Sequence, residues 1–392
     1  MAVSIFQIAG CLYTGVGAVD MIAEEVKKNA LKKPILVTDK GVTKAGVSGK
    51  IEEALKAAKI SYALYDGVVP NPTDTNVEEC YAVYTKEKCD CIIAVGGGSV
   101  MDCAKGCGIL THGKDPINAY EGINQMKGPL PFYFAVATTA GTGSESTVFA
   151  VITTTKEDHP RKMVLYDARM LPHVAILDPA LMVGMPPFIT ASTGCDALTH
   201  AVEGYISLGA NEYTDAVALH GIKLINTYLR KAVANGNDLH AREKMAYGQT
   251  LAGIALSNAA VGSVHALAHP LSSFFNISHG DANSLMLPYV LRYCQIACVE
   301  KFVEIAKAFD VHTHDMTPIE AADAAIAAIQ RLTSDVGIPP TITALAKARN
   351  LKVDKKHIPA MAKDGMKDVC TLFNPRVPKL EDYIALYEEA WG

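Results

Sequence analysis

The chain has 392 residues, enough for two or three domains, and its composition of 49% hydrophobic and 20% charged residues is typical of a large folded core. The net charge of −5 and the lack of a basic run argue against nucleic acid or an anionic membrane surface as a partner. Since no stretch reaches 18 consecutive apolar residues, we expect no transmembrane helix, and the N-terminus lacks the basic region of a signal peptide.

The ten cysteines form no CxxC pair and no short secreted framework. Cys103 and Cys107, like Cys294 and Cys298, are four residues apart, which is a helical spacing. Free thiols in a reducing compartment explain this pattern better than disulfides do. We therefore expect a cytoplasmic protein.

In chain order, the first half alternates short β-rich runs with helical stretches. Residues 91–95, "CIIAV", form a continuous apolar run, as a buried parallel strand does. Such alternation predicts βαβ units and a mostly parallel sheet. The expected strands are 34–39, 61–69, 91–95, 131–138 and 174–179, and the expected helices between them include 52–60 and 75–89.

Past Pro186 and Pro187 the strand signal fades and long helical patterns follow, such as residues 214–233 and 319–336. We expect a dinucleotide-binding α/β domain over 1–187 and a helical, metal-binding and catalytic domain over 188–392. The predicted fold class is thus α/β plus all-α, with a Rossmann-like N-terminal domain and an all-helical C-terminal domain.

A glycine-rich loop follows the strand at 91–95, in "AVGGGSVMDCAKG". Gly96, Gly97 and Gly98 let the backbone approach a ligand closely, and the N-terminus of the next helix favours an anion such as a pyrophosphate. Asp102 falls in the first turn of that helix. The alternative, a tight strand–helix turn without a ligand, has equal weight, because a glycine triplet alone is weak evidence. The loop is not GxGxxG, so the standard Rossmann fingerprint is absent.

Two further segments favour a nucleotide. Asp39 ends a predicted strand, where a carboxylate accepts bonds from ribose hydroxyls and repels a 2′-phosphate, which favours NAD over NADP. In isolation, a turn-forming Asp explains this residue equally well. The stretch "ATTAGTGSEST" (137–147) is dense in hydroxyl groups and glycine, although such loops are also common without ligands.

Two pairs of polar side chains lie in apolar surroundings. Asp196 and His200, in "TGCDALTHAVEGY", and His265 and His269, in "SVHALAHP", are each four residues apart and so share a helix face. Asp196, His200, His265 and His279, the last in "SHG" past a probable turn, together offer one carboxylate and three imidazoles, a set that suits Fe²⁺ or Zn²⁺. The alternative is that each is a satisfied core or capping residue. The absence of HExxH argues against a zinc protease.

These motifs, together with "YDGVVPNPT", "TTAGTGSE", "DVGIPP" and "CTLFNPR", resemble the iron-containing (group III) alcohol dehydrogenases from about residue 4 to the C-terminus. The resemblance implies a dinucleotide domain, a helical domain and an active site in the cleft between them. It implies NAD and one divalent metal, Fe²⁺ first and Zn²⁺ second, and a homodimer or larger homo-oligomer. It also implies reversible oxidation of small primary alcohols or diols to aldehydes, used mainly as aldehyde reduction.

The family motifs carry over residue by residue. The implied metal ligands are Asp196, His200, His265 and His279. His269 matches the family's non-ligand histidine near the nicotinamide and either carries the proton or only packs beside the site. The implied cofactor contacts are Asp39, Gly97, Gly98, Ser99, Asp102, Thr138, Thr139, Thr142, Thr147, Phe149, Lys162, Leu181, Gly184 and Met185.

By motif position, the substrate pocket is expected to be lined by Phe149, Leu256, Val261 and Cys370. Pro270 stands where many relatives have Gln, and Leu256 stands where some have Phe. These differences affect which substrate the resemblance implies but not which type of reaction. A reductase of a small anionic aldehyde such as sulfoacetaldehyde is one alternative. A lyase-type member of the superfamily, as dehydroquinate synthase is, and a filament-forming assembly protein are two others.

Overall fold

The computed structural model describes residues 5–113, 115–155 and 160–392, which form two compact units. One unit is Gln7–Gly184, and the other is Met185–Gly392 together with Phe6, whose ring packs on Tyr213. In the part of the chain described, no single helix is long and apolar enough to cross a membrane. Only the pair α8 (Leu239–Ala259) and α9 (Ser263–Phe275) taken together passes that test, and the two helices meet at a bend of 104°.

The first unit is built on a six-stranded sheet in the order β1-β9-β6-β4-β2-β3, in which every pairing is parallel. This confirms the predicted mostly parallel sheet. Because the strands run the same way, the loops after β2, β4, β6 and β9 leave the sheet at one edge. The strands are β1 (Cys11–Thr14), β2 (Pro34–Val37), β3 (Ala63–Tyr65), β4 (Cys91–Gly96), β6 (Phe132–Ala137) and β9 (Val174–Leu177).

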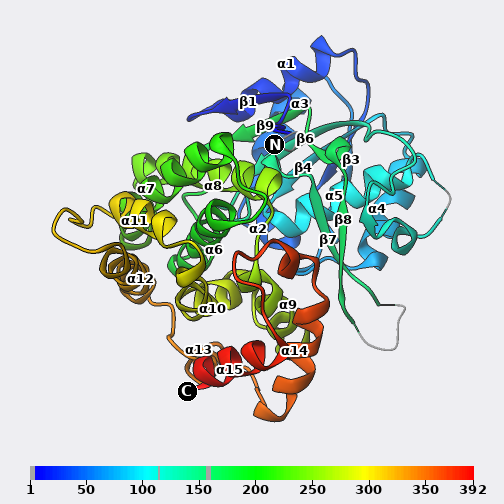
Figure 1. Ribbon diagram of the computed structural model, residues 1–392. Helices are drawn as coiled ribbons and strands as arrows, with labels where there is room; N and C mark the ends of the chain where they lie inside the picture. The colour runs from blue at the N-terminus through cyan, green and yellow to red at the C-terminus, as the bar shows by residue number, and fades with distance from the viewer. Residues whose placement is uncertain (1–4, 114, 156–159) are drawn as a thin grey trace. The chain divides into compact units, whose positions relative to one another are not determined.

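Helices cover both faces of this sheet (Figure 1). On one face, Ile22 of α1 and Ile51 of α3 join a buried cluster with Ile93 of β4. On the other face, α5 lies so close that a Cβ at Gly108 would come within 3.4 Å of Ile92. The two faces of β4 are therefore both apolar, which explains its continuous run. The helices are α1 (Met21–Lys28), α2 (Lys40–Lys44), α3 (Val47–Ala57), α4 (Asp74–Lys86) and α5 (Gly98–Leu110).

A second sheet of three strands, in the order β5-β8-β7, was not predicted. Its strands are β5 (Gly122–Ile123), β7 (Phe149–Thr153) and β8 (Lys162–Tyr166), and β7 pairs antiparallel with β8. Both longer strands alternate buried and half-buried residues, because only one face of the sheet is packed. The sequences "FAVIT" and "KMVLY" do not show this alternation, because apolar residues stand at both the buried and the half-buried positions.

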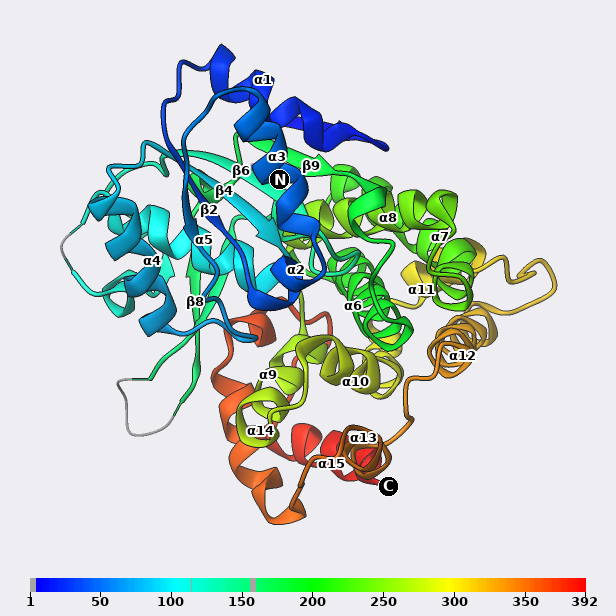
Figure 2. The same cartoon turned by 180° about the vertical axis from the view of Figure 1, so that it is seen from behind.

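The second unit is helical throughout its regular structure, as predicted (Figure 2). Its first three helices pack on one another, and α9 packs against both α10 and α14. The helices are α6 (Pro187–Ile206), α7 (Glu212–Ala234), α8 (Leu239–Ala259), α9 (Ser263–Phe275), α10 (His279–Cys294), α11 (Val299–Ala308), α12 (Pro318–Asp335), α13 (Ile342–Arg349), α14 (Ile358–Lys367) and α15 (Leu380–Trp391).

Candidate active site

Three helices of the second unit bring one carboxylate and three imidazoles together. Asp196 and His200 lie one turn apart on α6, His265 lies in the first turn of α9, and His279 is the first residue of α10. One ligand atom from each of the four lies within 4.8 Å of all the others. Asp196 Oδ1 is 3.8 Å from both His200 Nε2 and His279 Nε2. Ligands about 2.1 Å from a tetrahedral metal are roughly 3.4 Å apart, so the distances between these ligand atoms are close to those of a metal site.

The cluster is buried on all but one side. Asp196, His200 and His265 are 2%, 3% and 4% exposed, whereas the His279 side chain is 35% exposed. Among the residues the structure describes, no lysine or arginine forms an ion pair with Asp196. Burial and the neighbouring imidazoles lower the pKa of His265 well below its usual range, so its ring is neutral and offers a lone pair. A buried carboxylate without such a partner favours a bound cation.

The acceptors in this cluster outnumber the donors. The Asn283 Nδ2 lies 2.8 Å from Asp196 Oδ1, 3.0 Å from His265 Nε2 and 3.1 Å from His279 Nε2. One amide group has two hydrogens and cannot serve three acceptors at once. The buried His200 Nδ1 and Asn283 Oδ1 have no hydrogen-bond partner among the described residues. Converging lone pairs with too few protons fit a divalent cation, so the residues present suit the metal.

Glu203, one turn beyond His200 on α6, holds the ring of His265. Its Oε2 lies 2.5 Å from His265 Nδ1, and the carboxylate also accepts the backbone N–H groups of Gly262, Val264 and His265. Burial raises the pKa of this carboxyl to about 8, and the three backbone N–H groups act in the opposite direction.

His269 faces the same cluster from α9 but is held by a different partner. Its ring stacks on His279 with centroids 5.5 Å apart, and its Nδ1 lies 2.7 Å from Asp368 Oδ2. The other oxygen of Asp368 accepts the N–H of Cys370 at 2.9 Å. Burial alone would raise the pKa of Asp368, but His269 and the Cys370 N–H outweigh burial and bring that pKa to about 2. The Asp368 side chain is therefore an anion that orients His269.

In the first unit, the glycine-rich loop and the hydroxyl-rich loop lie side by side. A Cβ at Gly97 would meet Thr139 at 3.2 Å, and a Cβ at Gly98 would meet Thr142 at 2.8 Å. Gly97 caps α5 without any side-chain hydrogen bond, which leaves the first-turn N–H groups to a ligand. Thr138 N donates to Gly96 O at 3.1 Å, joining the two loops. This cradle of glycines and threonines fits a pyrophosphate.

Asp102 and Lys105 of α5 form hydrogen bonds with the hydroxyl-rich loop and with the strand that follows it. Asp102 accepts from Ser144 Oγ and from Val151 N, both at 3.1 Å. The buried Lys105 Nζ lies 2.8–3.1 Å from five oxygens of Ser144, Thr147 and Phe149. Both charged side chains of this helix, Asp102 and Lys105, thus form hydrogen bonds within the protein, and they set the shape of the loop.

Asp39 lies at the end of β2 and caps α2. Its Oδ1 accepts from Gly41 N at 2.7 Å and from Val42 N at 2.9 Å. The turn-forming role considered from the sequence is therefore present. Since both of these bonds go to Oδ1, Oδ2 is still available, and the capping role is compatible with a hydrogen bond from a ribose hydroxyl.

The remaining cofactor candidates occupy different environments. Lys162 Nζ donates to Asn71 Oδ1 at 2.7 Å, and Asn71 N donates to Ser99 Oγ at 3.3 Å, so Lys162 is linked to the glycine-rich loop. Leu181 is 3% exposed and belongs to the apolar core of its unit. Gly184 and Met185 end the first unit and begin the second, and Met185 O accepts from Arg242 at 3.2 Å.

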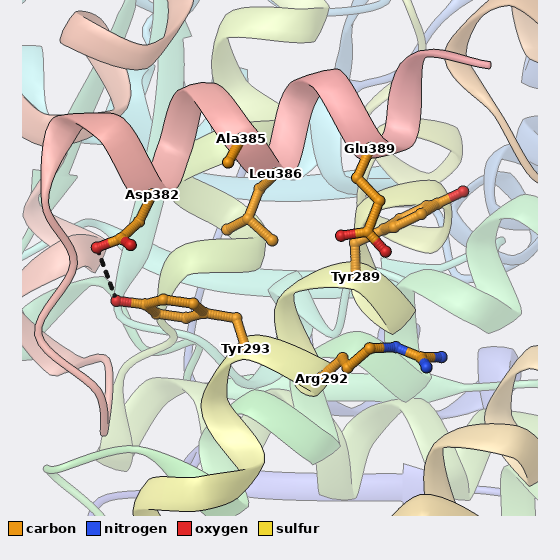
Figure 3. A pocket seen from close by; sticks show the side chains of 7 residues that line it. All are labelled: Tyr289, Arg292, Tyr293, Asp382, Ala385, Leu386 and Glu389. Carbon is orange, nitrogen blue, oxygen red and sulfur yellow. Dashed lines mark hydrogen bonds between the residues drawn. The ribbon is translucent and has the colours of Figure 1, made fainter.

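The expected substrate-pocket residues fall in both units. Phe149 lies in the first, with its ring 5.0 Å from Tyr166. In the second, Leu256 lies on α8, Val261 lies between α8 and α9, and Cys370 lies beside Asp368. A separate pocket of about 230 Å³ between α10 and α15 contains none of the predicted site residues (Figure 3); its lining is Tyr289, Arg292, Tyr293, Asp382, Ala385, Leu386 and Glu389.

Sequence reasoning did not identify Lys105, Glu203, Asn283 or Asp368. The sequence pattern could have identified Glu203, because this residue lies three residues after His200 and so shares the face of α6 that carries Asp196. Asp368 is 99 residues from His269, and only the packing of the chain brings the two together.

A parallel sheet with a glycine-rich phosphate cradle, and a helical unit with a buried Asp-His₃ cluster, define a metal- and dinucleotide-dependent oxidoreductase. Residues 10–179 match the family described as iron-containing alcohol dehydrogenase, and residues 190–391 match the C-terminal family of Fe-containing alcohol dehydrogenases. The chain belongs to the iron-containing alcohol dehydrogenase family. It is an alcohol/aldehyde oxidoreductase that uses NAD(H) and a divalent iron.

Individual relatives cover nearly the whole chain. A 1,3-propanediol dehydrogenase of Klebsiella pneumoniae is 44% identical over 97% of this chain and 96% of its own length. A lactaldehyde reductase of Escherichia coli (strain K12) is 43% identical over 96% of this chain and 97% of its own length. A crystal structure of 1,3-propanediol oxidoreductase superposes with a TM-score of 0.95 at 43% identity, covering both chains fully. The names of these relatives agree with the small alcohols, diols and aldehydes that the resemblance of the sequence motifs implied.

Proposed function

We propose that this enzyme interconverts small, uncharged primary alcohols or diols and their aldehydes, working mainly as an NADH-dependent aldehyde reductase. The observation that carries the proposal is the buried convergence of Asp196, His200, His265 and His279, whose acceptor atoms outnumber the hydrogens that Asn283 Nδ2 can offer. The similarity to enzymes named for propanediol and lactaldehyde, both uncharged, favours such substrates over an anionic aldehyde.

The first unit, in this proposal, is the dinucleotide domain. Gly97, Gly98 and Ser99 offer N–H groups to the pyrophosphate, and the threonine loop lies against them. Asp39 accepts bonds from the adenosine ribose and disfavours a 2′-phosphate. The wider cofactor set is Asp102, Thr138, Thr139, Thr142, Thr147, Phe149, Lys162, Leu181, Gly184 and Met185, of which Asp102 acts by shaping the loop.

The second unit is the metal-binding and catalytic domain. When bound, the divalent metal supplies Lewis acidity toward the substrate oxygen and NADH supplies the hydride. Asp196, His200, His265 and His279 hold the metal. His269, oriented by Asp368, holds or gives up the proton at Nε2 that the substrate oxygen gains on reduction. Leu256, Val261 and Cys370 of this unit exclude water and limit chain length.

We also infer a cytoplasmic homo-oligomer, a dimer or larger. All ten cysteines are free thiols, which supports a reducing compartment. Light scattering coupled to size exclusion gives the number of subunits, and a monomeric mass would contradict this inference.

The decisive experiment is an anaerobic panel of C2–C4 aldehydes, lactaldehyde and sulfoacetaldehyde with NADH, with the metal identified by mass spectrometry. We expect turnover of several uncharged aldehydes and about one iron per subunit. Activity restricted to sulfoacetaldehyde, or no NADH oxidation with any aldehyde in the presence of bound metal, would overturn the proposal.

A further inference from the structure

The Glu203 carboxylate connects α6 to the start of α9. A helix begins with backbone N–H groups that lack a partner within the helix. Here Glu203 Oε1 accepts from Gly262 N at 3.1 Å and Val264 N at 2.8 Å, while Oε2 accepts from His265 N at 3.3 Å. Ser263 N, between them, donates to Asn374 Oδ1 at 3.1 Å. The start of α9 is therefore capped from outside the helix, mainly by one buried side chain.

Only glycine fits where the chain turns beside this carboxylate. A Cβ at Gly262 would lie 2.8 Å from Asn374 Oδ1 and 3.2 Å from Glu203 Oε1. The close approach lets the backbone N–H groups reach both oxygens of Glu203. These donors direct their hydrogens at both oxygens of the side chain, so both oxygens act as acceptors.

His265 makes the last contact of this carboxylate, with Nδ1 2.5 Å from Oε2. Both oxygens of Glu203 already accept backbone N–H groups, so Oε2 faces Nδ1 as an acceptor and the hydrogen between these two atoms belongs to Nδ1. A neutral imidazole that carries its hydrogen on Nδ1 has its lone pair on Nε2. That Nε2 is the atom that lies 3.0 Å from Asn283 Nδ2, on the side of Asp196.

We propose that Glu203 is the positioning residue of the metal centre: it fixes His265 in the Nδ1–H tautomer and aims Nε2 at the metal. This rests on the proposed function, because it assumes that His265 is a metal ligand. Glu203 also lies on the same helix as Asp196 and His200, so one helix supplies two ligands and orients a third on α9. Partners of this kind typically account for about 10- to 100-fold in metal affinity.

The test is the E203Q variant, which keeps the size of the side chain but replaces one acceptor oxygen by an NH₂ donor. Every atom that faces Glu203 here is an N–H, so the new NH₂ has a suitable partner only at an unprotonated Nδ1. In E203Q we expect His265 to switch to the Nε2–H tautomer, which removes its lone pair from the metal. E203D, which keeps the charge on a shorter stem, is expected to retain the wild-type tautomer and to bind metal with intermediate affinity.

Two measurements apart from activity decide the outcome. Nitrogen NMR of histidine-labelled, metal-free protein reads the tautomer, and chelator competition with Co²⁺ gives metal affinity together with the visible spectrum of the bound ion. We expect about 10- to 100-fold weaker Co²⁺ binding in E203Q and an altered spectrum. The matched control is D215N, which alters a half-buried acid on α7 that pairs with Lys301 and is expected to bind Co²⁺ as wild type does.

The outcomes separate the two proposals. If wild-type protein binds no divalent metal, the proposed function fails. If wild type binds Co²⁺ and E203Q binds it equally well with an unchanged spectrum and tautomer, the role of Glu203 is overturned while the metal site stands. If E203Q does not fold, E203D decides: wild-type affinity and spectrum in E203D overturn the inference, and weakened binding with the Nδ1–H tautomer supports it.

Discussion

Asp368 Oδ2 lies 2.7 Å from Nδ1 of His269, and this contact orients an imidazole that lies beside the group of Asp196, His200, His265 and His279 without being part of it. The sequence left open whether His269 moves a proton or only packs. A carboxylate on Nδ1 turns Nε2 away from Asp368, as a proton-transferring imidazole requires.

The first prediction concerns this pair. D368N should lower kcat by about 10- to 100-fold with KM changed by less than about 3-fold, because the amide does not stabilise a charged imidazole as the carboxylate does. Steady-state kinetics with a good aldehyde and bound-iron analysis test it. D354N, a helix-capping acid on the same unit, is the control and should behave as wild type. Equal kcat values in D368N and wild type would show that His269 only packs beside the site and transfers no proton.

The second prediction concerns the metal. H265A should leave bound iron well below one per subunit and lower kcat on the order of 100-fold or more, because three ligands hold a divalent ion weakly. Metal content by mass spectrometry and kcat are measured on the same preparation. H220A, which alters an exposed histidine on α7, serves as the control. Full iron content with full activity in H265A would remove this residue from the ligand set.

The third prediction concerns cofactor choice. Since Asp39 caps α2 through one oxygen, D39N retains an acceptor for Gly41 and Val42 while removing the charge. D39N and D39G should both raise the NADP/NAD ratio of kcat/KM by about tenfold or more, ~1.4 kcal/mol, through lost repulsion of the 2′-phosphate. D39G should also lower the melting temperature slightly. If the ratio stays constant in both variants, Asp39 acts only as a cap.

The fourth prediction concerns pH. Burial lowers the pKa of Lys162 to about 8, so its positive charge is present below that pH and is lost above it. Because Lys162 is linked through Asn71 to Ser99 of the phosphate loop, NADH should bind more weakly as the pH rises through 8, by up to about tenfold. Fluorescence titration from pH 6.5 to 9.5 tests this. K162M should remove this change in NADH affinity with pH, and K162R should make it smaller. An identical change in K162M would show that another group causes it.

The fifth prediction concerns substrate size. Leu256 is half-buried near the end of α8, and L256F should narrow the pocket. Longer aldehydes should lose more kcat/KM than acetaldehyde does, by about 1–3 kcal/mol for each methylene that no longer fits. The series from acetaldehyde to butyraldehyde, with lactaldehyde, measures this. A uniform loss across the series would show that position 256 does not line the pocket.

Periodicity and loop chemistry in the sequence were sufficient to predict a parallel sheet followed by a helical unit. The continuous apolar run at 91–95 marks β4 because a strand covered on both faces has no polar side. The spacing of Asp196 and His200 predicts a shared helix face because an α-helix repeats every 3.6 residues. The short β7–β8 sheet was missed because its strands are brief and interrupt the βαβ pattern, and because its residues alternate in burial but not in polarity.

Tertiary structure decided the contacts between distant segments. Glu203 meets His265 from 62 residues away, and Asp368 meets His269 from 99 residues away. No local period links such pairs, since their distance depends on how α6, α9 and the segment after α14 pack. The same holds for Lys105, whose burial against the carbonyls of Ser144, Thr147 and Phe149 needs β7 beside α5. The sequence by itself thus determined which groups could bind a metal and a nucleotide, and packing determined which side chains orient them.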